Sequence, residues 1–232
     1  MSLIRQLSLF GVEASAPEPG DLAGLLAGAG RIDRLGHLSG SHARQPGQLG
    51  GSHARQPGQL GGSHARQPGG TARVSIVVDH PWRAAALVAE CARRGLVATV
   101  LKTVDEHIEV RTAYSAALMP LADAWSGPQP LANGAKHPPR GLLLDGRALR
   151  LWVEAAGRYE GATTYALELG VADEPVWSAV GAALAALGLR GQLVVPRSGI
   201  PAYRIVGKRR VAALAEMIGD PPKQAPAGLW PS

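Results

Sequence analysis

The chemistry that this sequence offers is mainly that of basic side chains. Its 24 lysines and arginines exceed its 18 aspartates and glutamates, which gives a net charge of +6 at pH 7. A basic chain favours an anionic partner such as a nucleic acid, because lysine and arginine contact phosphate groups. The net charge falls to +3 without the arginines of a repetitive segment, Arg44, Arg55 and Arg66. Basicity alone is therefore a weak argument for that partner.

Side chains that could act as nucleophiles, bases or metal ligands are scattered along the chain. The sequence contains no G-x-S-x-G, H-E-x-x-H or P-loop motif, and Ser178, His80 and Asp79 stand in no nucleophile-elbow context. The histidines His80, His107 and His137 lie in three separate segments, which gives no support for a metal site. We therefore expect no catalytic residues, no bound metal and no cofactor.

Length and composition indicate a globular protein without a membrane span. Of the 232 residues, 46% are hydrophobic, which is enough to fill a core. No run of 18 uninterrupted apolar residues occurs, and residues 1–20 hold a short apolar patch and a Pro/Glu/Gly linker without a convincing signal-peptide cleavage site. We expect this segment to pack on the body as a strand or short helix, and the protein to stay in the cytoplasm. The single cysteine, Cys91, lies in a helical pattern and is interpreted as a buried structural thiol.

Two similar helices organise the rest of the chain. Residues 21–30, DLAGLLAGAG, and residues 149–157, LRLWVEAAG, place small residues where another backbone could approach closely. Asp21 is a candidate N-cap for the first helix. Each helix ends at a glycine, Gly30 or Gly157, which as a C′ residue would let the chain turn into a strand. We expect two similar halves to pack through these helices.

The segments after the first helix alternate between strand and helix patterns. The strand at 72–79 is rich in β-branched residues, and the amphipathic helix at 81–94 has Gly95 as its stop. A turn at residues 104–106 separates the next two strands, which predicts antiparallel pairing. The predicted order is helix, strand, strand, helix, strand, strand, helix, over residues 21–30, 31–40, 72–79, 81–94, 96–103, 106–115 and 116–125.

A tandem repeat interrupts this first half at residues 41–70. The unit SHARQPGQLGG recurs with a period of 11 residues, and the copies are identical letter for letter. A segment rich in Gly, Pro and Gln, with one leucine per copy at most, cannot bury enough surface to fold. We interpret it as a disordered duplication in a tolerant surface loop. The alternative is an arm that contacts phosphates or binds metal through His42, His53 and His64.

The second half repeats the order of the first. Asp145 caps a helix after a Pro/Gly-rich linker, and the following segments predict strands and helices over residues 162–170, 173–188, 190–199, 200–208 and 209–220. The second strand of this half is the least well defined. Trp82 and Trp177 begin equivalent helices and are interpreted as core anchors rather than base-stacking platforms. The expected organisation is an N-terminal segment at 1–20, a first half at 21–125, a linker at 126–144, a second half at 145–220 and a tail at 221–232.

This duplicated pattern resembles the LAGLIDADG family in its single-chain form. The segment LAGLLAGAG matches the name motif at Leu22, Ala23, Gly24, Leu25 and Gly30, and residues 203–219 resemble the family's last strand and final helix. The resemblance implies an α+β fold of two pseudo-symmetric αββαββα halves, packed through their LAGLIDADG-like helices, with antiparallel sheets forming a saddle. The alternative is that residues 22–30 are only a helix of small residues in an Ala-rich protein.

The motif departs from the family at the positions that hold metal. Family members that cut DNA are homing endonucleases, in which an acidic residue before the final glycine of each motif binds a divalent cation. The corresponding residues here are Ala29 and Ala156, which cannot ligate Mg²⁺. The earlier acidic position falls on Ala27 and Glu154, and a single carboxylate cannot assemble a two-metal centre; Glu154 could instead cap a backbone or meet Arg158 at i+4. We therefore expect no nuclease activity.

The resemblance also implies a binding surface on the strands, which in the family lie in the major groove of DNA. Lys208 resembles the family's basic residue near a strand end, and two arginines follow it at the start of a helix. The alternative is that the basic residues form a solvated rim. The candidate DNA-binding residues are Arg31, Arg34, Arg73, Lys102, Arg111, Arg190, Arg197, Tyr203, Arg204, Lys208, Arg209 and Arg210.

The leading hypothesis is a monomeric, non-catalytic protein that binds double-stranded DNA in a regulatory or architectural role. It is similar in logic to bacterial transcription regulators that reuse this fold, although their added helix-turn-helix domain is not evident here. Binding to structured RNA is one alternative. A protein-interaction scaffold of the same fold is another, favoured by the charge of only +3 outside the repeats. The third is a divergent metal-dependent nuclease that depends on Glu154.

Overall fold

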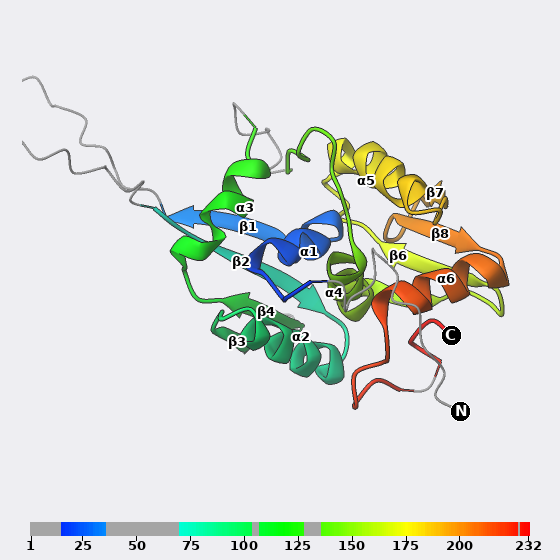
Figure 1. Ribbon diagram of the computed structural model, residues 1–232, viewed down its shortest axis with the longest axis horizontal. Coiled ribbons are helices and arrows are strands. Elements are labelled where there is room, and N and C mark those ends of the chain that lie inside the picture. Colours follow the sequence, from blue (N-terminus) through cyan, green and yellow to red (C-terminus); the bar gives the residue numbers. More distant parts are fainter. Residues whose placement is uncertain (1–14, 36–69, 104–106, 128–135, 227) are drawn as a thin grey trace, which may run out of the picture.

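The first half of the chain forms one four-stranded antiparallel sheet with helices packed on one of its faces (Figure 1). The computed structural model describes residues 15–35, 70–103, 107–127, 136–226 and 228–232. The strand order of this sheet is β1-β2-β4-β3. Its elements are a 3-10 turn (Pro19–Leu22), α1 (Ala23–Ala27), β1 (Arg31–Leu35), β2 (Thr71–Val78), α2 (Pro81–Arg93), β3 (Ala98–Lys102), β4 (Ile108–Thr112), a second 3-10 turn (Ala116–Leu118) and α3 (Met119–Ala124).

The second half repeats this architecture with the strand order β5-β6-β8-β7. Its elements are α4 (Gly146–Ala156), β5 (Gly157–Tyr159), β6 (Thr164–Glu168), α5 (Glu174–Ala186), β7 (Gln192–Val194), β8 (Ala202–Val206) and α6 (Lys208–Ile218). The predicted α+β fold of two similar halves is therefore confirmed. Strand β5, which the sequence left undefined, has only three residues and follows α4 without a loop. None of the helices in the described ranges is long and apolar enough to cross a membrane.

Several sequence predictions fall outside the described residues. These are the repeat insert, most of the N-terminal segment, the turn at 104–106 and part of the linker. The described end of the predicted linker packs on the body, because Leu142 and Leu144 are buried in the core. The tail also returns to the body, where the buried Trp230 donates its indole N–H to the Gly219 carbonyl at 3.0 Å.

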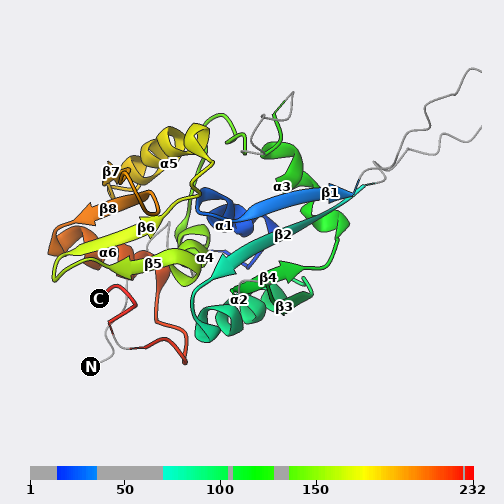
Figure 2. The same ribbon diagram turned by 180° about the vertical axis from the view of Figure 1, so that it is seen from behind.

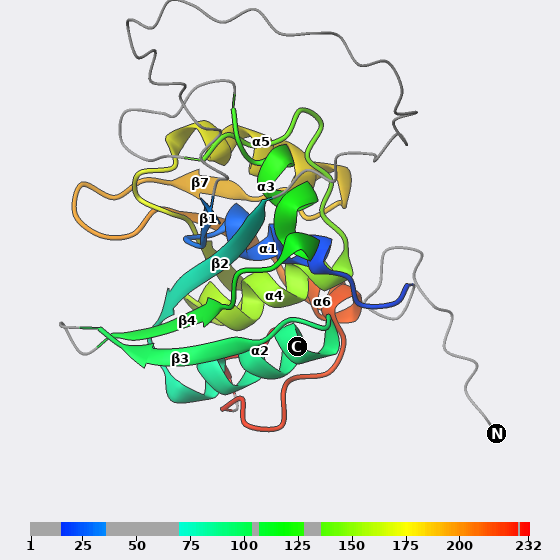
Figure 3. The same cartoon turned by 90° about the vertical axis from the view of Figure 1, so that its left-hand side faces the viewer.

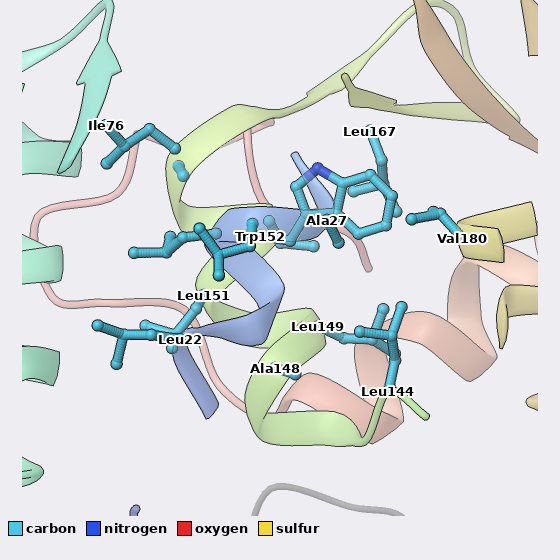
Figure 4. Packing of buried hydrophobic residues seen from close by; sticks show 14 of the residues in the cluster. Leu22, Ala27, Ile76, Leu144, Ala148, Leu149, Leu151, Trp152, Leu167 and Val180 are labelled. Carbon is cyan, nitrogen blue, oxygen red and sulfur yellow. The ribbon is translucent and has the colours of Figure 1, made fainter. Parts of the chain in front are cut away.

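Helices α1 and α4 meet at the centre of the molecule with their backbones in contact (Figures 1 and 4). A Cβ on Gly24 would lie 1.8 Å from the carbonyl oxygen of Ala148, so only glycine permits this approach. Figure 4 shows the fully buried indole of Trp152 surrounded by Ala27, Leu167 and Val180. The predicted packing of the two halves through these helices is confirmed.

The glycines that end the paired helices serve a different purpose from the predicted one. Neither Gly30 nor Gly157 has a positive φ, and Gly157 is extended at φ −89 and ψ 142. A Cβ at Gly157 would lie 2.5 Å from the Tyr165 hydroxyl, so close packing, not chain reversal, requires glycine there. Asp21 is not the N-cap either, since it lies inside the first 3-10 turn and accepts the Glu18 N–H at 3.1 Å.

Other local predictions are confirmed. Asp145 accepts the backbone N–H of Ala148 at 2.8 Å and so caps α4. Gly95 ends α2 with a φ of 69°. Cys91 is buried, and burial raises the pKa of its thiol to about 11, as expected of an unreactive structural residue. Trp177 packs against the core as predicted. The same prediction for Trp82 is wrong, because Trp82 is half-buried beside the guanidinium of Arg83 and is not part of the core cluster.

Replacing Gly24 by alanine will destabilise the protein by about 1–3 kcal/mol, because the new methyl group must separate two backbones that cannot yield locally. The measurement is urea unfolding followed by circular dichroism. Gly20→Ala is the matched control, since a Cβ there meets nothing within 4 Å. Equal stabilities of the two variants would contradict the close contact of α1 with α4.

Candidate nucleic-acid interface

The first sheet presents charged side chains on the face turned away from its helices. Residues of β2 alternate, so that Val74 and Ile76 are buried beneath the helices while Arg73 and Ser75 face outward. Directly paired residues share a face, and the strand register therefore gives the other outward charges (Figure 3). They are Arg31 and Asp33 on β1, and Glu109 and Arg111 on β4.

Most of these outward arginines form ion pairs within the sheet. Arg73 Nε lies 3.1 Å from Asp33, and its guanidinium stands 4.8 Å over the ring of Tyr114. Arg111 pairs with Glu109 of its own strand at 2.6 Å. Arg31 is exposed and has no ion-pair partner within the part of the chain that the structure describes. The outward face of this sheet thus keeps one unpaired cation.

The second sheet carries a charge network on the corresponding face. Arg158 of β5 pairs with Glu168 of β6 at 2.6 Å and with Glu160 at 2.7 Å. Glu160 also pairs with Arg204 of β8. Both arginines have about 40% of their side chains exposed, at 41% and 40%. This network has no net charge, unlike the face of the first sheet.

The ends of α1 and α4 lie between the two sheets (Figure 2). A cleft of about 370 Å³ lies there and is lined by residues of both sheets. The first sheet contributes Val77 to its lining, and the second contributes Arg158 and Glu168. Ala29 and Ala156, the positions that the family resemblance assigns to metal-binding acids, also line it. The strand faces and the former metal positions therefore belong to one surface.

Three predicted site residues lie elsewhere. Tyr203 is on the inner face of its sheet, where it is buried and donates its hydroxyl to the Trp177 carbonyl at 2.8 Å; burial raises the pKa of that hydroxyl. Arg34 and Lys102 share the helix-covered face of the first sheet with Ala72 and Ile108, their cross-strand partners. The expectation that Tyr203 faces a nucleic acid is wrong, because its side chain is buried. Arg34 and Lys102 are exposed, but the strand register places them on the face opposite to that of Arg31 and Arg111.

The remaining predicted residues are exposed but lie outside the strands. Arg190 and Arg197 are in the segments before and after β7. Lys208, Arg209 and Arg210 form the first turn of α6, and Arg210 donates to the Val206 carbonyl at 3.0 Å. None of these five residues lines the cleft, although Ile200, in the same segment as Arg197, does.

A buried lysine caps the C-terminal end of α1. Lys136 Nζ donates to the carbonyls of Gly28 and Gly30, both at 2.7 Å, and pairs with Asp173 at 2.9 Å. Burial lowers the pKa of Lys136 to about 8, so the ammonium still predominates at neutral pH. A cation at this helix end neutralises the carbonyls that no helical N–H reaches.

A buried arginine does the same for α4. Arg83 donates through Nη1 to the Glu154 carbonyl at 2.8 Å and the Val153 carbonyl at 3.1 Å, and through Nη2 to the Gly157 carbonyl at 2.7 Å. Its Nε lies 2.8 Å from Asp79. Arg83 comes from the start of α2, and Asp173, which holds Lys136, precedes the equivalent helix α5. Each half therefore closes the helix end of the other.

The residues at this position do not fit the divalent cation that the family resemblance implies. The two alanines offer no oxygen ligand, and the ammonium and guanidinium groups already occupy the nearby carbonyls. The carboxylates that line the cleft, Asp79 and Glu168, are each paired with an arginine. Among the residues that the structure describes, no three His, Cys, Asp or Glu side chains group as metal ligands.

Glu154, the one carboxylate in the motif positions, is sealed in the interior. Its side chain is 0% exposed and lies 3.0 Å from Arg150, one turn earlier, instead of meeting Arg158 as predicted. Arg150 also contacts Glu90 of α2 at 3.1 Å. Burial raises the pKa of Glu154 to about 8 against the lowering influence of Arg150.

The burial of Lys136 and of the charged residues in and next to α2 was not predicted from the sequence. A usable signal existed for α2, because Arg83, Glu90 and Arg94 fall with Leu87 on one helical face that also carries its apolar residues. Lys136 had no comparable signal, since it stands in a segment without periodicity.

Comparison with solved structures shows the fold. The chain is similar to the homing endonuclease I-WcaI bound to its DNA recognition sequence, at 10% identity and a TM-score of 0.54, covering 88% of this chain and 81% of that one. It also aligns with the N-terminal LAGLIDADG domain of DUF199/WhiA (12% identity, 97% and 96% covered, TM-score 0.46) and with I-DmoI in complex with DNA and Mn (14%, 88% and 97%, 0.45). No protein-family model and no curated protein matches the sequence. The chain has a LAGLIDADG-like fold.

Glu154→Gln will flatten the pH dependence of stability between about pH 5 and pH 8. The folded-state pKa of Glu154 is raised from 4.5 to about 8, so the folded protein holds a proton that the unfolded chain releases, and wild-type stability falls as pH rises through this window. The check is the melting temperature of both proteins across the window. Parallel curves would contradict burial of this carboxyl group.

Lys136→Met will lower the free energy of unfolding by about 3 kcal/mol, because Asp173 and two carbonyls lose their buried cation. Denaturant unfolding measures this change. Lys102→Met removes an exposed lysine from an edge strand and serves as the control, with little expected effect. Similar stabilities of the two variants would show that the α1 end needs no cap.

Proposed function

We propose that this protein is a non-catalytic DNA-binding protein, regulatory or architectural in role, that contacts the duplex with the outward faces of both sheets. The observation that carries the proposal is the placement of five arginines, from both halves, on faces that meet at one cleft. They are Arg31, Arg73, Arg111, Arg158 and Arg204. The major groove of B-DNA admits β-strands, and arginine is suited to both phosphates and guanine edges. The homing endonuclease I-WcaI, which has a similar fold, is solved bound to its DNA recognition sequence, and this supports DNA as the partner.

The charge balance of the surface favours selective binding over bulk attraction. The five arginines share their faces with four carboxylates, Asp33, Glu109, Glu160 and Glu168, which leaves a net charge of +1. Sequence-independent affinity for phosphates increases with the number of cationic side chains that no nearby carboxylate neutralises. A nearly neutral surface of oriented hydrogen-bond donors gains affinity mainly from DNA sequences whose base edges match those donors.

The centre of the surface supports the absence of cleavage. Strand scission by this fold depends on metal held beside the paired helix ends, and here Lys136 and Arg83 bind the carbonyls at those ends. Ala29 and Ala156 supply no replacement ligands. Arg83 therefore places a fixed guanidinium in the lining of the cleft, where a nuclease needs a bound metal ion.

The test is a binding titration with duplex DNA and a hairpin RNA at about 50 mM and about 200 mM salt with Mg²⁺ present. Arg31→Ala combined with Arg73→Ala will weaken duplex binding roughly tenfold and reduce the salt slope by about 2, as expected for two lost phosphate contacts. Arg34→Ala is the matched control. Arg34 lies on β1 with Arg31, but on the helix-covered face of the sheet, where it pairs with Asp123.

Supercoiled plasmid incubated with Mg²⁺ or Mn²⁺ will remain intact in the same experiment. Metal-dependent cleavage that disappears with Glu154→Gln would overturn the non-catalytic assignment. Binding to the RNA hairpin alone would replace DNA by RNA as the partner. Binding to neither would favour the protein-scaffold alternative, to which the neutral second sheet is suited.

A further inference from the structure

We infer that Glu160 is a positioning residue that orients Arg158 and Arg204 for contacts to base edges, and that Arg204 selects guanine. This inference rests on the proposed function. Its starting point is the register of the second sheet, which aligns four residues in one row across the outward face. In strand order the row reads Arg158, Ala166, Arg204 and Gln192.

A short, fully buried residue separates the two arginines of the row. Ala166 lies between them and is 0% exposed, so neighbouring side chains close over the space of about 10 Å, two strand spacings, that separates the arginine backbones. Gln192, on the far side of Arg204, is exposed. Arginine and glutamine are the side chains whose paired donors and acceptors match the edges of guanine and adenine in the major groove.

Glu160 ties the two arginines together. Its side chain is 13% exposed, lower than either arginine, and it accepts from Arg158 Nη2 through one oxygen and from Arg204 Nε through the other. Glu168 accepts from Arg158 Nε at 2.6 Å. The four charges therefore form a chain across β5, β6 and β8 whose members fix one another's rotamers.

The contact from Glu160 to Arg204 leaves the terminal nitrogens of the Arg204 guanidinium available for a ligand. Glu160 engages the Nε edge of that guanidinium, and within the described ranges Nη1 and Nη2 have no hydrogen-bond partner. A guanidinium anchored at one edge presents the other donors in a fixed orientation, which is the arrangement needed for a bidentate contact to guanine O6 and N7. The neutral total charge of the network means that this contact adds discrimination with little general attraction to phosphate.

The first sheet provides a contrast. Glu109 pairs with Arg111 two residues away on its own strand, and no second arginine among the described residues contacts this carboxylate. Glu109 therefore neutralises one side chain, whereas Glu160 couples two strands. This difference makes Glu109→Gln a matched control for Glu160→Gln.

The experiment selects a preferred duplex from a random library with wild-type protein, then measures affinities for that duplex and for its single-base variants. Glu160→Gln will reduce discrimination against replacement of the guanine contacted by Arg204 by roughly 5- to 100-fold, as expected for one bidentate pair. Affinity for unrelated duplex will stay equal or rise, because a negative charge is removed. Arg204→Lys keeps the charge but lacks the planar fork, and will lose the same discrimination. Glu109→Gln will leave it unchanged.

Unchanged discrimination in Glu160→Gln, with the wild type binding its selected duplex, would overturn the inference while leaving the proposed function intact. An equal loss of affinity for selected and unrelated duplex would also overturn it, since that pattern reports general destabilisation. If Glu160→Gln fails to fold in thermal unfolding controls, the Arg204→Lys result decides in its place. A wild-type protein that binds no duplex would overturn the proposed function and this inference together.

Discussion

The contact between the backbones of α1 and α4 is the constraint on which the rest of the structure depends. Gly24 lets the carbonyl of Ala148 come within a distance that any side chain would prevent. This approach brings the ends of both helices to one place and sets the two sheets on either side of them (Figure 2). The cleft, the crossed helix caps and the shared strand surface all follow from it.

Close approach of the helices also encloses charges that belong to both halves. Arg150 of α4 pairs with Glu90 of α2, and Arg94, which follows α2, pairs with Glu90 at 2.6 Å and with Asp21 at 2.8 Å. Buried pairs of this kind add little net stability compared with apolar residues, but removing one partner leaves a costly unpaired charge. We interpret the network as fixing the relative orientation of the two halves. Arg83, at the end of α4, carries buried charge to the lining of the cleft.

The sequence predicted the elements better than their faces. Helices and strands with clear periodicity, such as α2 and β2, and the cap at Asp145 follow from local chemistry and were found at the expected places. Strand β5 was missed because three residues that directly follow a helix carry no periodic signal. Tyr203 was misplaced because one residue of register exchanges the buried and exposed faces of a strand. Lys136 could not be anticipated, since its role depends on contact with residues more than a hundred positions away.

The two halves share a fold but have diverged in the charge of their outward faces. The first sheet retains Arg31 without a partner, whereas every outward arginine in the described strands of the second sheet is paired with a carboxylate. A symmetric surface would contact two half-sites in the same way. Under the proposed function, the divergence assigns more of the phosphate attraction to the first half and more of the oriented hydrogen bonding to the second. Because the helix contact fixes both halves in one body, the electrostatic capture by one sheet would bring the other sheet into register with the base edges.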